Sequence, residues 1–133
     1  MLVAVADTHA VLWYLSADPR LSLNAKNLFT KTAQQGDNIG ISAITLVEMV
    51  YLVERGRISP QEFTQLAQLI SQSSGLLVEL PIDIKISRTL SSVNVQQVPD
   101  MPDRIIATTA VVYGVPLISR DAKIRASSVM TIW

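Results

Sequence analysis

A chain of 133 residues is long enough to bury the core of one domain, and its 49% hydrophobic content excludes a disordered composition. The absence of cysteine excludes disulfides, thiolate metal sites and cysteine nucleophiles. Eleven Lys and Arg balance eleven Asp and Glu, so a polyanion would have to be held by a local patch or by bound cations.

The location of the protein is also constrained by the pattern of apolar residues. The longest apolar block, residues 41–53, is interrupted by Ser42, Thr45 and Glu48 and is too short to span a bilayer. The N-terminus lacks a basic region followed by a signal-peptide core. We therefore expect a soluble, cytoplasmic protein with no membrane contact.

The first half of the chain alternates short apolar strands with helices. Ser22 is a favoured N-cap, Gly36 and Gly56 are helix stops, and Ser59-Pro60-Gln61-Glu62 is a typical helix start. These patterns predict strands over residues 3–6 and 38–42 and helices over residues 10–15, 23–35, 43–55 and 60–72.

The second half continues the alternation after a turn predicted at Ser73–Gly75. We predict strands over residues 76–80, 115–119 and 129–132, helices over residues 82–90 and 104–113, and a short turn or helix over residues 120–124. Residues 92–101 read as a loop, closed by Pro99–Asp103. Strands alternating with helices indicate an α/β fold in one domain over residues 1–133, with a parallel sheet of about five strands covered on both faces.

Asp7 has the most informative position in the chain. It stands at the carboxyl end of the first predicted strand, where open α/β sheets bind their ligands. Asp is also a favoured N-cap, so the alternative is that Asp7 only caps the helix that Thr8 opens.

Three further acids have positions that need an explanation. Glu48 lies inside an apolar helix and needs a partner, for which a structural ion pair with Arg55 or another basic residue is the alternative to a functional role. Asp103 is placed directly before the helix of residues 104–113 and Asp121 directly after the fourth strand, so capping and turn roles are their alternatives.

Taken together, the four acids predict a shared site. The carboxyl ends of parallel strands meet at one edge of the sheet, which places Asp7 and Asp121 there, and Asp103 and Glu48 can reach that edge from neighbouring helices. Clustered carboxylates repel one another unless they bind divalent cations, and hard oxygen ligands suit Mg²⁺ or Mn²⁺. Because such ions activate water and neutralise a phosphoryl group, the pattern indicates phosphodiester chemistry.

The motifs that surround these acids resemble those of a known family. They are Asp7–Trp13, Ile41–Ile44 leading to Val47–Met49, Asp103–Ala110, and Pro116–Asp121. In this order and spacing they resemble PIN-domain ribonucleases, specifically the VapC-type toxins of bacterial and archaeal toxin–antitoxin pairs, over essentially the whole chain. The resemblance implies that Asp7, Glu48 and Asp103 are the core metal-binding acids and Asp121 the fourth.

The same resemblance carries functional expectations. It implies a PIN domain that acts as a metal-dependent endoribonuclease, uses Mg²⁺ or Mn²⁺, and leaves a 5′-phosphate and a 3′-hydroxyl on RNA. It also implies a homodimer and a cognate antitoxin, a segment of which occupies the groove. Family members often have Ser or Thr before the last acid, and here Ser119 is expected to hold a metal-bound water or a phosphate oxygen.

Other residues near the acids have two readings each. Thr8 either caps the helix or lines the cleft through its hydroxyl. Arg104 and Arg120 flank acids, and we favour the reading in which they offset carboxylate repulsion over one in which they bind RNA phosphate. The only histidine, His9, is more often structural than a ligand in such a position. Asp100 reads either as a loop residue or as one that supports the site from beside it, because Asp103 is the acid directly before the helix.

The aromatic residues Trp13 and Tyr14 have a similar ambiguity. An aromatic residue in a first helix more often belongs to the core or to a dimer surface, although these two rings can stack on unpaired bases. Their placement therefore depends on the tertiary structure.

Two rival functions remain open at the level of sequence. One is phosphoryl transfer through Asp7 as a covalent nucleophile, although the phosphatase pattern requires a second Asp where this chain has His9. The other is a non-catalytic PIN-like binding module with a degenerate acidic site.

Overall fold

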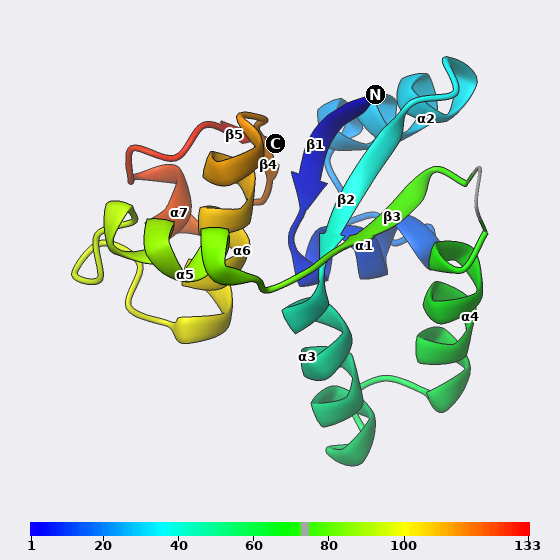
Figure 1. Ribbon diagram of the computed structural model, residues 1–133. Helices are drawn as coiled ribbons and strands as arrows, with labels where there is room; N and C mark the ends of the chain where they lie inside the picture. The colour runs from blue at the N-terminus through cyan, green and yellow to red at the C-terminus, as the bar shows by residue number, and fades with distance from the viewer. Residues whose placement is uncertain (73–74) are drawn as a thin grey trace.

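Parallel strands form the centre of the protein in the computed structural model, as Figure 1 shows. The strands are β1 (Leu2–Ala6), β2 (Asn38–Ser42), β3 (Leu77–Leu80), β4 (Leu117–Ile118) and β5 (Thr131–Ile132). Their order across the sheet is β3-β2-β1-β4-β5, and every neighbouring pair is parallel. The prediction of an α/β fold is therefore confirmed, although β4 and β5 are shorter than the predicted strands.

The structure describes residues 1–72 and 75–133, so most of the turn predicted at Ser73–Gly75 lies outside the described residues. The helices are α1 (Thr8–Leu15), α2 (Leu23–Gln34), α3 (Ala43–Glu54), α4 (Pro60–Ile70), α5 (Ile84–Thr89), α6 (Met101–Tyr113) and α7 (Ala122–Arg125), with a 3₁₀ turn η1 (Leu90–Ser92) after α5. Helix α1 begins two residues before its predicted start. No helix in these described ranges has the length and apolar character needed to cross a bilayer.

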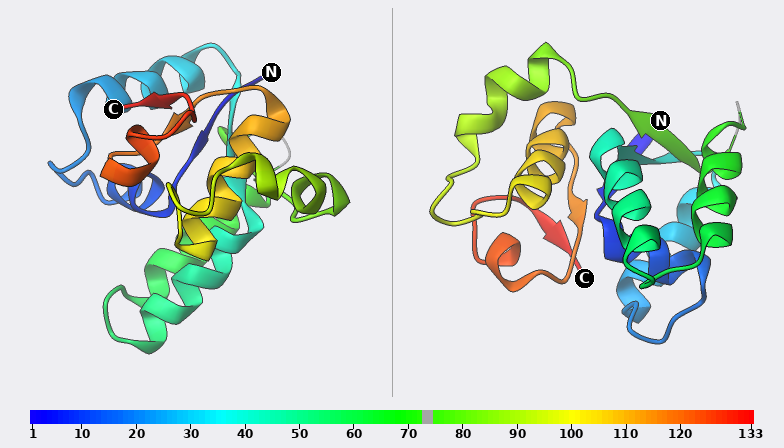
Figure 2. Two further views of the ribbon diagram at one scale, coloured as in Figure 1. Left: turned by 90° about the vertical axis from the view of Figure 1, so that its left-hand side faces the viewer. Right: turned by 90° about the horizontal axis from the view of Figure 1, so that it is seen from below.

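Alternate residues of the strands feed two separate cores, one on each face of the sheet. Ala4 and Ala6 of β1 face α1 and α2, whereas Val5 faces α6. Phe29 of α2 is fully buried in the first core, where its ring stacks on that of Tyr14 at 4.2 Å. Figure 2 shows these helices on opposite sides of the strands. Tyr14 is thus a packing residue, as the sequence favoured.

The start of α6 differs from the prediction. The expected helix began at Arg104 with Asp103 in front of it, but α6 begins at Met101 and Asp103 lies in its first turn. Asp100 is the N-cap, and its Oδ2 accepts from the Asp103 backbone N–H at 3.2 Å. The prediction was wrong because Pro102 was read as part of a loop, whereas proline is well tolerated in the first turn of a helix.

The strand order reverses at β1, which makes the gap between β1 and β4 the switch point of the sheet. The chain continues from β1 into β2 and β3 on one side, and β4 and β5 occupy the other. The Asp7 N–H donates to the Ile118 carbonyl at 3.1 Å, so the ends of β1 and β4 are held together. Open α/β sheets bind ligands at such a point.

Candidate active site

A cleft of about 430 Å³ lies at the carboxyl ends of β1 and β4. Its walls include all four predicted acids, namely Asp7, Glu48, Asp103 and Asp121. The remaining lining residues are Thr8, His9, Trp13, Arg20, Arg120, Ala122 and Trp133. Segments from both ends of the chain, and from α3 and α6 between them, therefore meet around one cavity.

Asp7 caps a helix and also lines the cleft. Its Oδ1 accepts from the Ala10 backbone N–H at 2.8 Å, which is an N-cap bond at the start of α1. The residue is only 9% exposed and also lines the cleft. Burial raises the pKa of the Asp7 carboxyl, while the Ser119 side chain and the Ala10 N–H oppose that increase. The capping bond therefore does not exclude a second role.

Glu48 reaches the cleft from α3 and has a hydroxyl as its partner. The Thr8 hydroxyl donates to Glu48 Oε1 at 2.6 Å, and the Thr45 hydroxyl lies 3.1 Å from that of Thr8. Burial is the main cause that raises the pKa of the Glu48 carboxyl, and the Thr8 bond opposes it. Neither ion pair of the described residues includes Glu48.

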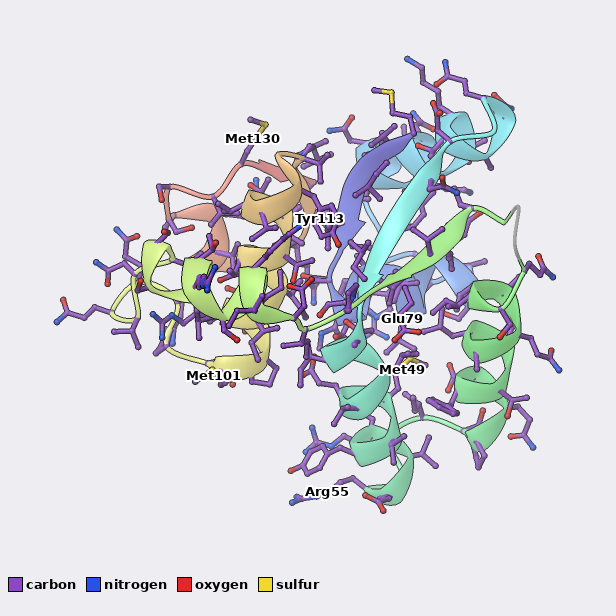
Figure 3. The ribbon with its side chains drawn as sticks, in the orientation of Figure 1. Met49, Arg55, Glu79, Met101, Tyr113 and Met130 are labelled. Atoms are coloured by element: carbon purple, nitrogen blue, oxygen red, sulfur yellow. The ribbon has the colours of Figure 1, made fainter. Side chains whose placement is uncertain are left out.

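The alternative of a structural ion pair between Glu48 and Arg55 is wrong. Arg55 lies at the far end of α3, as Figure 3 shows, and its guanidinium sits 4.6 Å from the centre of the Tyr51 ring. Glu48 is therefore a half-buried acid without a cationic partner among the residues that the structure describes, an arrangement that costs stability in the absence of a bound cation.

The carboxyl of Asp103 has a strongly raised pKa. Burial, followed by Asp100, Asp121 and the other cleft acids, raises the pKa of its carboxyl from 3.8 to about 7. Asp100 is also the main charged group that raises the pKa of Glu48. The sequence left Asp100 as either a loop residue or a residue that supports the site from beside it, and as the N-cap of α6 it acts on the charges of the site. If Pro102 had been recognised as a first-turn proline, Asp100 would have been predicted as the N-cap of this helix.

Asp121 and Ser119 complete the wall that follows β4. Asp121 caps the short helix α7 through Oδ1, which accepts from the Lys123 and Ile124 N–H groups at 2.9 and 3.0 Å. The buried Ser119 hydroxyl accepts from the Asp121 N–H at 3.1 Å. Ser119 does not itself line the cleft. Its side chain contacts two acids that do, Asp7 and Asp121.

Of the other candidate residues, some line the cleft and one does not. The Arg104 Nε donates to the Val93 carbonyl at 2.9 Å, and Arg104 is not among the residues that line the cleft. His9 and Arg120 do line it. Sequence reasoning missed Arg20, which lies in the loop between α1 and α2 and is far in sequence from the cleft acids other than Asp7.

The acids suit a divalent cation by chemistry and charge. They supply hard oxygen ligands, and their carboxyls raise one another's pKa values, which is a repulsion that a cation relieves. As the side chains stand, no three His, Cys, Asp or Glu groups within residues 1–72 and 75–133 are arranged to hold one ion. Binding would therefore require side-chain rotation within the cleft.

Thr8→Val tests the contact between the first helix and Glu48. The variant keeps the shape of the side chain but removes the donor to Glu48 Oε1, so we expect the Glu48 pKa to rise further. Divalent-ion affinity should then fall by roughly tenfold, measured by calorimetry at neutral pH. Thr8→Ser retains the hydroxyl and should bind ions like the wild type. Equal affinities of the Val and Ser variants would contradict this role.

The chain is similar to known proteins over nearly its whole length. Residues 4–128 match the PIN domain family. A curated relative, Ribonuclease VapC22 of Mycobacterium tuberculosis, is 24% identical over 136 residues, covering all of both chains.

Solved structures share the fold at low sequence identity. VapBC2 from Rickettsia felis bound to a promoter DNA fragment gives a TM-score of 0.72 at 18% identity, covering 98% of this chain and 97% of that chain. FitAcB from Neisseria gonorrhoeae gives 0.63 at 17% identity, covering 97% and 96%. The match to the family spans nearly the whole sequence and includes every acid of the cleft. The chain belongs to the PIN domain family.

Proposed function

We propose that this protein is a metal-dependent endoribonuclease that acts as the toxin of a toxin–antitoxin pair. The observation that carries the proposal is the convergence of Asp7, Glu48, Asp103 and Asp121 on one cleft at the switch point of the sheet. Four carboxylates without cysteine, and with one histidine beside them, match the ligand chemistry of Mg²⁺ or Mn²⁺ and of phosphodiester hydrolysis.

The acids would hold one or two of these ions. A bound Mg²⁺ or Mn²⁺ lowers the pKa of a water molecule and neutralises charge that develops on a phosphoryl group. The chain's own contribution is to orient the ligands. The Thr8 hydroxyl holds Glu48, the Ala10 N–H holds Asp7, and the Ser119 hydroxyl accepts from the N–H of Asp121.

The comparisons support the biological part of the proposal. The PIN family membership, the ribonuclease relative and the toxin–antitoxin complexes among the solved structures are all consistent with it. We infer RNA as the substrate, a cognate antitoxin as the partner, a homodimer as the assembly and the cytoplasm as the location. None of the partners is needed to build the cleft, which one chain forms by itself.

A cleavage assay tests the proposal. Purified protein should cut single-stranded RNA when Mg²⁺ or Mn²⁺ is present, and EDTA should abolish the reaction. The products should carry 5′-phosphates, which can be detected by their direct ligation. Persistent cleavage in EDTA would contradict metal dependence. If the protein does not cleave RNA and calorimetry detects no binding of divalent ions, the result would favour the non-catalytic binding module.

A further inference from the structure

The cleft has a basic and aromatic part beside its acids. The guanidinium carbons of Arg20 and Arg120 lie 4.7 and 4.4 Å from the centre of the Trp13 ring. The Trp133 ring meets that of Trp13 edge-on at 5.9 Å. All four residues line the same cleft as the carboxylates. A guanidinium stacked on an aromatic ring is held in place while its N–H groups remain available at the edge.

Distant segments of the chain build this arrangement. Trp13 belongs to α1 and is only 6% exposed, so it is a fixed platform. Arg20 lies in the loop after α1, Arg120 comes two residues after the end of β4, and Trp133 follows β5. Because β1, β4 and β5 are neighbours in the sheet, their carboxyl ends bring these residues together.

The two arginines keep donors for a ligand. Asp18 binds Arg20 on one edge, with Nε and Nη2 at 3.0 and 2.8 Å from its two carboxylate oxygens. This contact uses two of the five N–H donors of Arg20. Arg120 takes part in neither ion pair of the described chain. Both side chains are exposed at the cleft.

The contacts of the two arginines do not involve the cleft acids. The ion pairs of the described residues are Met1–Asp37 and Arg20–Asp18, so neither joins an arginine to a carboxylate of the cleft. That Arg120 offsets carboxylate repulsion stays a prediction. Two guanidinium groups held over one ring also suit a separate anionic ligand.

We propose that Arg20 and Arg120 form a subsite that binds a backbone phosphate of the RNA strand next to the phosphodiester at the acids. This inference rests on the proposed function. Guanidinium groups bind phosphate oxygens through two parallel N–H bonds, and Trp13 is the positioning residue that holds both groups. An acidic peptide is the alternative ligand for a guanidinium pair. RNA is favoured because the same cleft holds the four acids that we assign to phosphodiester hydrolysis.

A second cavity adjoins the cleft. It has a volume of about 320 Å³, shares Asp103, Asp121 and Ala122 with the cleft, and is also lined by Asp100 and Lys123. The two cavities are therefore adjacent at Asp103 and Asp121, and the second adds Lys123 as a further cation near the acids.

RNA binding by charge-neutral variants tests the subsite. Arg20→Gln and Arg120→Gln are each made in the Asp7→Asn background, in which we expect the RNA to stay intact. Anisotropy of a fluorescein-labelled, mixed-sequence single-stranded oligoribonucleotide is then measured with Mg²⁺ over a range of salt. Each change should weaken RNA binding by roughly tenfold. The magnitude of the negative slope of log K against log salt should fall by about 0.7, because one phosphate contact is lost.

Two variants separate this role from a general effect of charge or folding. Arg88→Gln removes an exposed arginine on α5 that lines neither cavity, and it should leave affinity and slope unchanged. Arg120→Lys keeps the charge but loses the two-pronged contact, so it should retain the slope and recover only part of the affinity. Thermal unfolding of every variant verifies that the fold is intact.

The outcomes distinguish this inference from the proposed function. Arginine variants that bind RNA with unchanged affinity and slope would overturn the subsite and leave the ribonuclease assignment standing. A parent protein that neither binds nor cleaves RNA would overturn both. Arginine-dependent binding of an oligoglutamate peptide without RNA binding would also overturn the subsite, in favour of an acidic protein segment.

Discussion

Asp7→Asn should abolish metal-dependent RNA cleavage, with a loss of at least about a hundredfold in turnover, while the protein remains folded. Asn is as good an N-cap as Asp, so the bond to the Ala10 N–H can be retained. The variant therefore removes the negative charge from the cleft without removing the cap. A role limited to capping predicts no loss of activity, whereas a role as metal ligand predicts nearly complete loss.

Asp83→Asn is the matched control for this substitution. Asp83 is also an N-cap, accepting from the Lys85 and Ile86 N–H groups at the start of α5, but it does not line the cleft. Its variant should cleave RNA like the wild type. Activity is measured as initial rates with Mn²⁺ or Mg²⁺, and folding by circular dichroism. Undiminished cleavage by Asp7→Asn would contradict the assignment of Asp7 as a metal ligand.

The metal-free protein should become less stable as the pH rises. The pKa of Asp103 is about 7 in the fold, well above the 3.8 of a free aspartate side chain. Between these values the folded state binds more protons than the unfolded state, so unfolding becomes easier with increasing pH. The stabilisation is complete below about pH 4 and is lost through pH 7. A saturating divalent cation should restore it at pH 8.

Asp103→Asn isolates the contribution of this carboxyl. Without cations at pH 8, the variant should be more stable than the wild type by on the order of 1 kcal/mol, after allowance for solvent screening of a half-buried group. Loss of an acid from the first turn of α6 offsets part of that gain. With a cation at about a hundred times its dissociation constant, the wild type should gain about 2.7 kcal/mol and the variant less.

Thermal unfolding at pH 5 and pH 8, with EDTA or with Mn²⁺, measures these differences. Glu79→Gln is the control for charge. Glu79, which Figure 3 labels, is an exposed acid on the edge strand β3 and does not line the cleft. It should not change the response to cation or pH. An Asp103→Asn variant that is less stable than the wild type in EDTA at pH 8 would contradict the proposed repulsion.

The local signals in the sequence determined most of the secondary structure. Short apolar runs, the caps Asp7, Ser22 and Ser59, and the stop at Gly114 act over a few residues, so they can be read without knowledge of the fold. Where two local readings competed, as at Pro102, the sequence could not decide between a loop and a first helical turn. Tertiary packing selected the helix and made Asp100 its cap.

The sequence also determined which acids could share a site, because the carboxyl ends of parallel strands meet at one edge. Only the tertiary structure decided their surroundings. Hydrogen bonds and ring contacts between residues far apart in the chain depend on side-chain positions that no local pattern encodes. Thus the partner of Glu48 is Thr8 rather than Arg55, and Arg20 joins Arg120 over Trp13.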